Sequence, residues 1–335
     1  MGSTERSIVL VCEDVGAAAA LAPVAQRLLA QHRNPAISAR GQAAAIFASK
    51  CIPFGGPESV AVSAATGVVV TGTTAWGERI EAHAIRKARS LHVPTLSFVD
   101  FWSNYRERLT LTQEFDVLPD RLLVVDSVMY DDLRALELPT ELVITGSPVF
   151  DEIKPLAPPS DGSPVLFLSQ PLSKLATVEY DEHTVIALVA TACVRLGVEL
   201  RVRPHPREDR TELATFLATL AGTTISRSDA SLMDDVVSSC GVVGMTTMAL
   251  VEAALTGRAT LSVQLTYKPI LLPTIRSELT VMVQTQPQLA SAVARLVAGA
   301  RQSRPIGDYF LADSAARVVA VIDDILRNGE LRAHD

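Results

Sequence analysis

Residues 241–263 read GVVGMTTMALVEAALTGRATLSV, and this stretch decides the class of fold. It begins with a short apolar run, continues with a helical stretch of small and apolar residues, and ends with a second apolar run. Short continuous apolar runs are typical of strands buried on both faces, and a helix between two of them favours a parallel sheet. The stretch therefore predicts a strand–helix–strand unit, with Thr246 and Thr247 where the first strand meets the helix.

The same alternation continues along a chain of 335 residues. This length exceeds what one hydrophobic core ordinarily covers. The predicted fold class is therefore α/β, with two doubly wound parallel sheets in two domains that face a cleft. The predicted strands are 7–12, 67–72, 93–100, 121–126, 141–146, 164–169, 198–203, 241–245, 259–263 and 279–283, and the predicted helices of the second half are 180–196, 208–220, 247–256, 286–300 and 311–328.

A change of composition in the middle of the chain marks the domain boundary. Residues 154–164, KPLAPPSDGSP, hold four prolines and show no periodicity, which is typical of a linker. We therefore predict an N-terminal domain over 1–153, a linker over 154–163 and a C-terminal domain over 164–310. The last segment, 311–335, is predicted as a helix that crosses back to the N-terminal domain.

Composition and charge exclude several classes of function. The chain has 30 Lys and Arg against 37 Asp and Glu, so it lacks the basic footprint of a nucleic-acid-binding protein. No apolar run approaches the roughly 20 residues of a membrane-spanning helix, and the first residues show no signal-peptide pattern. The four cysteines form no CxxC pair, which favours free thiols and a cytoplasmic location.

Polar residues follow three predicted strands of the second half. Ser169 and Gln170 close the first of these strands, His205 comes shortly after the second, and Thr246 and Thr247 follow the third. In parallel α/β sheets, ligands bind beyond the carboxyl ends of the strands, because loops and helix N-termini converge there. We therefore expect Gln170, His205 and Thr246 to line one anion-accepting pocket.

His205 lies between two prolines in the segment RPHPRE (203–208). Proline disfavours the helical region for the residue before it, so Arg203 and His205 are held extended. An imidazole can donate to a phosphate oxygen, and the flanking Arg203 and Arg207 suit an anion. A solvated turn is the alternative interpretation. The charged residues that follow are interpreted as surface groups: Glu208, Asp209 and Arg210.

Thr246 and Thr247 open the predicted helix 247–256. A helix N-terminus has unpaired N–H groups and a partial positive charge, so this position suits a phosphate. Gly244 lets a ligand approach the backbone, and Glu252, about one and a half turns along, is placed to accept both hydroxyls of a ribose. The alternative is ordinary N-capping by threonine.

The segments SQP (169–171), RPHPRE (203–208) and GMTTMALVEAALTGRATLSV (244–263) resemble the donor-nucleotide half of GT-B-fold glycosyltransferases, particularly bacterial capsule-type enzymes and sialyltransferases. The resemblance implies two Rossmann-like domains, with a nucleotide-activated sugar in the second and an acceptor in the first. It implies that the His-Pro pair and the hydroxyl pair contact the donor phosphates, in the biosynthesis of a polysaccharide or natural product. Nucleotide-sugar 2-epimerases share this fold.

Two carboxylates of the N-terminal domain are candidates for the general base that deprotonates an acceptor. Asp14 follows the first strand in the segment EDVG (13–16), which is similar to the acidic-acidic-Gly motif of bacterial sialyltransferases with Val15 inserted. Its alternative role is to cap the following helix. Asp100 ends another predicted strand, just before aromatic residues that suit a sugar or aromatic acceptor. The other predicted acceptor-side residues are Glu13, Gly16, Thr73, Trp102 and Tyr105.

No metal and no cofactor is expected beyond the donor substrate. The acidic pairs lie in predicted helices, and the remaining histidines lack metal-ligand partners and are interpreted as structural. These residues are Asp131-Asp132, Asp234-Asp235, Asp323-Asp324, His32, His83, His92 and His183. The expected partners are a nucleotide sugar and an acceptor, with no nucleic acid and no transmembrane segment, and a homodimer stays open.

Three functions stay open. The first is a metal-independent glycosyltransferase in which residues at the strand ends stabilise the departing nucleotide phosphate. The second is a nucleotide-sugar 2-epimerase or hydrolase, although the first strand lacks the Gly-Thr-Arg-Pro-Glu turn of that group and residues 97–108 lack its Glu-Ala-Gly-Leu-Arg segment. The third is a non-catalytic nucleotide-sugar or glycan-binding protein, which needs neither Asp14 nor Asp100.

Overall fold

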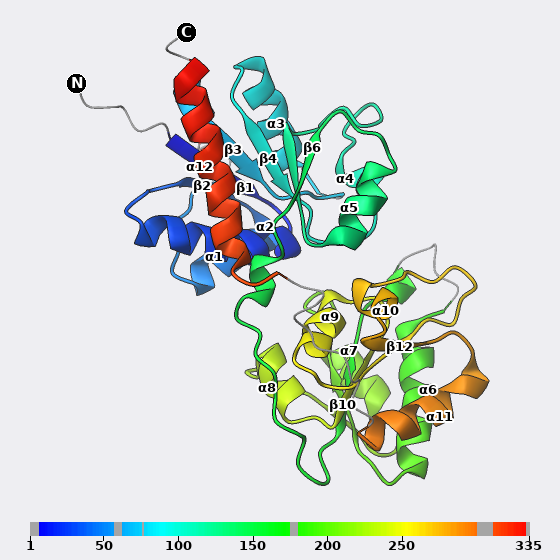
Figure 1. Cartoon of the computed structure of the whole chain (residues 1–335). Coiled ribbons are helices and arrows are strands. Elements are labelled where there is room, and N and C mark those ends of the chain that lie inside the picture. The colour runs from blue at the N-terminus through cyan, green and yellow to red at the C-terminus, as the bar shows by residue number, and fades with distance from the viewer. Residues whose placement is uncertain (1–6, 57–61, 76, 175–179, 300–310, 333–335) are drawn as a thin grey trace. The chain divides into compact units, whose positions relative to one another are not determined.

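The computed structural model describes residues 7–56, 62–75, 77–174, 180–299 and 311–332. These residues form two compact units, each built on a six-stranded parallel sheet with helices between its strands (Figure 1). One unit comprises Met1–Glu152 and Gly307–Asp335, and the other comprises Ile153–Ile306. The predicted fold class is confirmed: the chain is α/β, with two Rossmann-like doubly wound domains.

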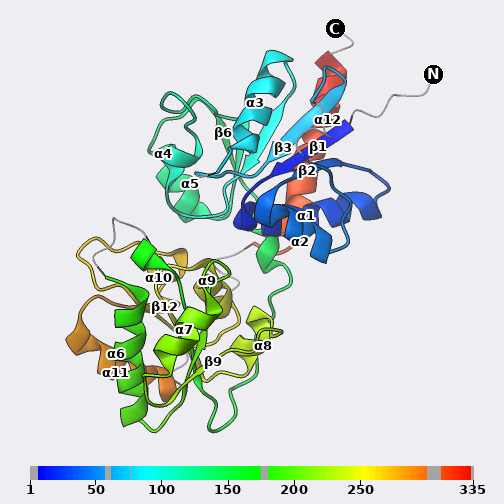
Figure 2. The same ribbon diagram turned by 180° about the vertical axis from the view of Figure 1, so that it is seen from behind.

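The sheet of the first unit has the strand order β2-β1-β3-β4-β5-β6. Val9 and Val11 of β1 pack with α3, whereas α12 lies beside α1 (Figures 1 and 2). The strands are β1 (Ser7–Cys12), β2 (Ala36–Ala39), β3 (Thr66–Thr71), β4 (Thr95–Phe98), β5 (Arg121–Val124) and β6 (Glu141–Ile144). The helices are α1 (Val15–Ala30), α2 (Gly41–Ser49), α3 (Ile80–Ser90), α4 (Tyr105–Arg108), α5 (Ser127–Arg134), the 3₁₀ turn η1 (Pro148–Phe150) and α12 (Ser314–Arg332).

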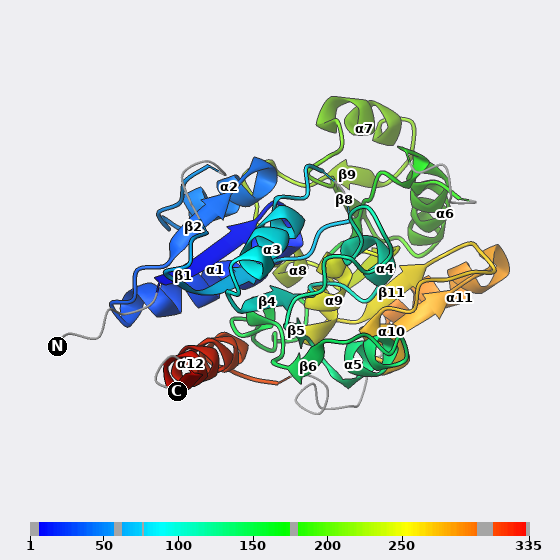
Figure 3. The ribbon, with the colours of Figure 1, turned by 90° about the horizontal axis from the view of Figure 1, so that it is seen from above.

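The sheet of the second unit has the strand order β12-β11-β10-β7-β8-β9. Its core lies between the strands and helices α6, α7 and α11, and α7 lies beside the edge strand β9 (Figure 3). The strands are β7 (Val165–Leu168), β8 (Leu200–Arg203), β9 (Thr223–Ile225), β10 (Gly241–Gly244), β11 (Thr260–Val263) and β12 (Thr280–Val283). The helices are the 3₁₀ turn η2 (Leu172–Lys174), α6 (Glu182–Arg195), α7 (Arg210–Leu217), α8 (Leu232–Val237), α9 (Met248–Leu255), α10 (Pro273–Arg276) and α11 (Gln286–Val297).

The C-terminal helix α12 belongs to the first unit, although the second unit precedes it in the sequence. Its start is held by Asp151, whose carboxylate oxygens accept from Ser314 N at 2.7 Å and Ala315 N at 2.8 Å. Its buried side chains Val318 and Ile322 are fully enclosed. Among the described residues, no helix is both long enough and apolar enough to span a bilayer.

Two strands and four α-helices are absent from the sequence-based prediction: β2, β9, α2, α4, α8 and α10. The two strands span four and three residues, and β9 is half-exposed at a sheet edge, so neither gives a long apolar run. Residues 154–163, predicted as a linker, lie in the second unit, where Leu156 N donates to Thr256 O at 2.8 Å.

Candidate functional site

The sheet order of the second unit brings three predicted segments to one edge. Strands β10, β7 and β8 are neighbours, and both pairings are parallel, with Val243 opposite Phe167 and Leu168 opposite Arg203. The carboxyl ends of the three strands therefore lie side by side, and the residues that follow them share one edge.

Gln170 and Thr246 are in direct contact at this edge. Gln170 Oε1 accepts from Thr246 N at 2.8 Å and lies 3.5 Å from Thr246 Oγ1. Thr247 is the N-cap of α9, since its hydroxyl accepts from Ala249 N at 3.3 Å. A Cβ added to Gly244 would meet its nearest neighbour at 3.4 Å, an ordinary contact, so packing within the chain does not require glycine there.

Glu208 joins the ends of β7 and β8. Its carboxylate accepts from Ser169 Oγ at 2.7 Å and from His205 N at 2.6 Å. The interpretation of Glu208 as a surface charge is therefore wrong, because both of its oxygens are bound within the fold. Burial raises the pKa of the Glu208 carboxyl, and these hydrogen bonds oppose that shift.

Arg203 does not contribute a free charge to the edge. Its Nη1 atom lies 2.6 Å from Asp235 Oδ2 and also donates to the carbonyl oxygens of Ala230 and Ser231. Asp235 is buried, so the guanidinium neutralises it. The expectation that Arg203 serves an anionic ligand is corrected: the side chain ties β8 to α8.

Glu252 lies in α9 with its side chain half-buried. Among the described residues, no hydrogen bond or ion pair to its carboxylate is found. Burial raises the pKa of Glu252 to about 7, because the charged form loses hydration without gaining a partner. A half-buried carboxylate without a partner is suited to accept hydrogen bonds from a ligand.

The acidic turn after β1 is tied to the start of α3. Glu13 N donates to Glu81 Oε1 at 2.7 Å, while the Glu13 carboxylate accepts from Glu78 N at 2.8 Å and Ile80 N at 3.3 Å. Glu13 therefore holds two segments of the first unit together. Asp14 is the N-cap of α1, with its Oδ1 accepting from Val15 N at 2.8 Å.

Asp100 is buried next to the start of α1. Its Oδ1 lies 2.7 Å from Arg108 Nη1, which also donates to Thr73 O at 2.8 Å and Thr73 Oγ1 at 3.1 Å. A Cβ added to Gly16 would lie 1.9 Å from Asp100 Oδ2. Burial raises the pKa of Asp100, although the Arg108 guanidinium opposes that shift. The structure thus brings Asp100, Gly16 and Thr73 together, with Asp100 and Thr73 buried.

The two aromatic residues predicted on the acceptor side, Trp102 and Tyr105, both contact carboxylates of the first unit. Trp102 is buried, and its Nε1 donates to Asp126 Oδ1 at 2.9 Å, so it belongs to the core. The expectation that Trp102 offers an open face to an acceptor is therefore corrected. Tyr105 OH lies 3.4 Å from Asp132 Oδ2 of α5.

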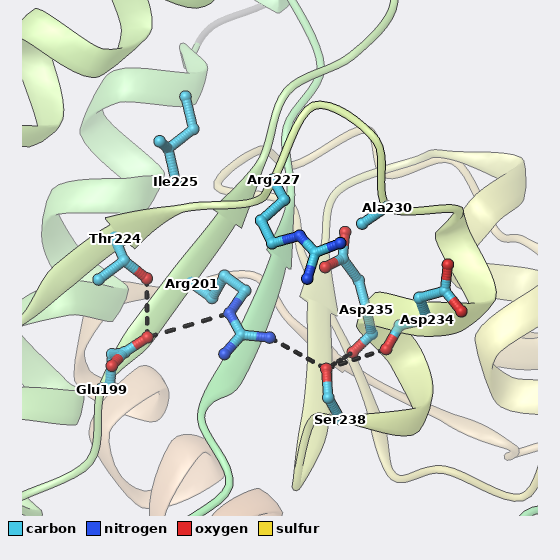
Figure 4. Close-up of a pocket in the computed structure, with 9 residues that line it drawn as sticks. All are labelled: Glu199, Arg201, Thr224, Ile225, Arg227, Ala230, Asp234, Asp235 and Ser238. Atoms are coloured by element: carbon cyan, nitrogen blue, oxygen red, sulfur yellow. Dashed lines mark hydrogen bonds and ion pairs between the residues drawn. The ribbon is translucent and has the colours of Figure 1, made fainter.

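A broad hollow of about 720 Å³ lies beside β8, β9 and α8 rather than at the β7–β8–β10 edge (Figure 4). Its charged side chains bind hydroxyl groups, other charged groups or neighbouring backbone. Glu199 Oε1 accepts from Thr224 Oγ1 at 2.7 Å, and Arg201 Nη1 donates to Ser238 Oγ at 3.0 Å. Arg227 is paired with Asp229 at 2.8 Å. Glu199, Arg201 and Arg227 of this hollow thus each have a partner within the chain.

Comparisons with known proteins establish the fold of the whole chain. No protein-family model matches it, and no curated protein sequence matches it. Among solved structures, the chain is similar to the UDP-GlcNAc 2-epimerase of Methanocaldococcus jannaschii, with TM-score 0.68, 11% identity, and 95% of this chain and 99% of that chain covered.

Two further structures are similar over nearly the whole chain. The Neisseria meningitidis UDP-GlcNAc 2-epimerase bound to UDP-GlcNAc has TM-score 0.66 and 11% identity, with 95% of this chain and 100% of that chain covered. The spinosyn rhamnosyltransferase SpnG in complex with thymidine diphosphate has TM-score 0.54 and 13% identity, with 94% and 99% covered. The chain thus has a two-domain fold that occurs in both epimerases and glycosyltransferases.

Proposed function

We propose that the chain is a metal-independent glycosyltransferase that takes its sugar from a nucleotide-activated donor. The observation that carries the proposal is the arrangement at the start of α9: the Gln170 carboxamide on the Thr246 N–H, and Glu252 without a partner further along the same helix. His205 follows the neighbouring β8, where Glu208 ties it to β7. Similar structures that contain UDP-GlcNAc or thymidine diphosphate support a nucleotide ligand.

Each group has a proposed role in the donor site. The start of α9 and His205 receive the phosphates, where preorganised donors stabilise the charge that develops on the departing nucleotide by several kcal/mol. Glu252 accepts the ribose hydroxyls. Asp14 is the preferred base for the acceptor, because Asp100 is enclosed and paired with Arg108.

A nucleotide-sugar 2-epimerase or hydrolase is the second candidate. The observation in its favour is the TM-score, which is 0.68 for the Methanocaldococcus jannaschii epimerase and 0.54 for SpnG. The two reactions separate by experiment. An epimerase or hydrolase converts a nucleotide sugar without any acceptor, whereas a transferase releases nucleotide only when an acceptor is supplied.

The site itself is tested with the variant His205→Ala. We expect it to weaken nucleotide binding by about tenfold or more, because a hydrogen bond to a charged phosphate contributes about 1.5–3 kcal/mol. The measurement is titration calorimetry with UDP, CMP and thymidine diphosphate. His83→Ala is the matched control, because His83 is exposed on α3. Equal affinity in His205→Ala and the native chain would remove the proposed donor site.

A further inference from the structure

The segment after β8 determines where the ring proton of His205 lies. Arg207 N donates to His205 Nδ1 at 3.1 Å. A backbone N–H can only donate, so Nδ1 must accept and carries no proton while this bond exists. The one ring proton of a neutral imidazole is then on Nε2. Among the described residues, no side chain or backbone group hydrogen-bonds to Nε2.

Glu208 holds the backbone that makes this bond. Its Oε2 accepts from His205 N at 2.6 Å, its Oε1 accepts from Ser169 Oγ at 2.7 Å, and Glu208 N donates to His205 O at 2.9 Å. Residues 205–208 are thereby closed into a turn that is fastened to the end of β7. The position of Arg207 N relative to the imidazole depends on that turn.

We propose that Glu208 is a positioning residue that, together with the Arg207 amide, holds His205 as a neutral imidazole with its proton on Nε2. The ring then offers one fixed hydrogen-bond donor to an anionic oxygen, and its charge does not change around neutral pH. Ser169 is engaged by Glu208 and supplies no contact to that anion. The identity of the anion as a donor phosphate rests on the proposed function, whereas the tautomer does not.

The charged surroundings agree with a neutral ring. Burial, with the nearby Arg207 guanidinium, lowers the pKa of His205 below its ordinary value of 6.5. A lowered pKa means that the protonated form becomes populated only on the acidic side of that value. The other titratable neighbours act on Glu208 from α6: Glu182 raises its pKa and His183 lowers it.

The tautomer is tested without any nucleotide, by long-range proton–nitrogen NMR on chain labelled with ¹⁵N-histidine. The His205 signal is assigned from its absence in His205→Gln. At about pH 7.5 we expect Nε2 to have the shift of a protonated nitrogen and Nδ1 that of an unprotonated one. A proton on Nδ1, or on both nitrogens, would overturn the proposal.

The role of Glu208 is tested with two variants and a control. In Glu208→Ala we expect a mixture of the two tautomers, and in Glu208→Gln the native tautomer, because the amide oxygen can still accept from His205 N. Glu212→Ala is the control, since Glu212 is exposed on α7. If Glu208→Ala does not fold, Glu208→Met takes its place, because it removes both acceptor oxygens while keeping most of the side-chain volume. A native tautomer in whichever of these two variants folds would refute the role of Glu208.

A second readout links the tautomer to the ligand. With UDP as probe, the native dissociation constant should change less than about twofold between about pH 6.5 and 8, and Glu208→Ala should weaken it about tenfold. A native dissociation constant that rises steeply above pH 6.5 would show that the charged ring binds, against the proposal. If UDP, CMP and thymidine diphosphate all fail to bind, the proposed function is lost while the NMR result still decides the tautomer.

Discussion

At the scale of single residues, the ionised Glu252 carboxylate lowers the stability of the folded chain, because burial removes its hydration and no partner among the described residues replaces it. Its carboxyl is half-buried on α9, and burial alone raises its pKa from 4.5 to about 7. Below about pH 4.5 the group is protonated in both the folded and the unfolded chain. As the pH rises towards 7, the unfolded chain ionises first, and the folded chain loses relative stability.

The variant Glu252→Gln removes this cost, because an amide has no charge to desolvate. We expect it to be more stable than the native chain by up to about 2 kcal/mol at about pH 8, and equally stable at about pH 4.5. Urea unfolding at the two pH values measures the difference, with Glu212→Gln as an exposed control. The same variant should bind nucleotide more weakly if Glu252 holds the ribose. A Glu252→Gln variant that is less stable than the native chain at pH 8 would contradict the claim that the ionised carboxylate destabilises the fold.

The sequence predicts some of these residues and not others. Gln170, His205 and Thr246 are predicted to share an edge because parallel strands end on the same side, and the structure places Gln170 on Thr246 at that edge. Glu208 is missed because a run of charged residues is usually solvated. Trp102 is misplaced because its partner, Asp126, is distant in sequence.

At the scale of elements, the start of α1 packs directly on the end of β4. Gly16 makes this approach possible, because a Cβ there would lie 1.9 Å from Asp100 Oδ2. Asp100 is also paired with Arg108, so the contact joins α1, β4 and α4. The role of Gly16 in this structure is to allow that contact.

The variant Gly16→Ala is expected to destabilise the chain by about 2 kcal/mol, because Asp100 must move away from Arg108. Gly162→Ala is the control. Gly162 has a φ of +76° but open space, so it should cost only about 1 kcal/mol through the backbone. Chemical denaturation compares the two. A Gly16→Ala chain as stable as the native one would mean that Asp100 can move freely.

Strands were predicted where an apolar run is present in the sequence. Such runs predicted ten of the strands, including the partly exposed edge strands β6 and β12. The short edge strands β2 and β9 lack that signal, and the helices α2 and α8 follow them.

At the scale of the whole molecule, α12 completes a unit that begins far from it in sequence. The fully buried Ile322 of α12 is enclosed within the first unit. We expect Ile322→Ala to destabilise that unit by about 3 kcal/mol. Hydrogen exchange should speed up in β1 and α1 and stay unchanged in β7 and β8. Val194→Ala, at a side chain 48% exposed on α6, should change neither unit. Equal acceleration in both units would contradict the assignment of α12 to the first unit.

This return of the chain has a consequence for synthesis on the ribosome. Most of the first unit is translated before the second unit, yet α12, which packs beside α1, is translated after every residue of the second unit. The second unit is contiguous and has all its residues as soon as it leaves the exit tunnel. Between these two units, the order in which all residues become available is therefore the reverse of the order in which the units begin, and a stop codon that removes the last turns of α12 leaves the first unit incomplete.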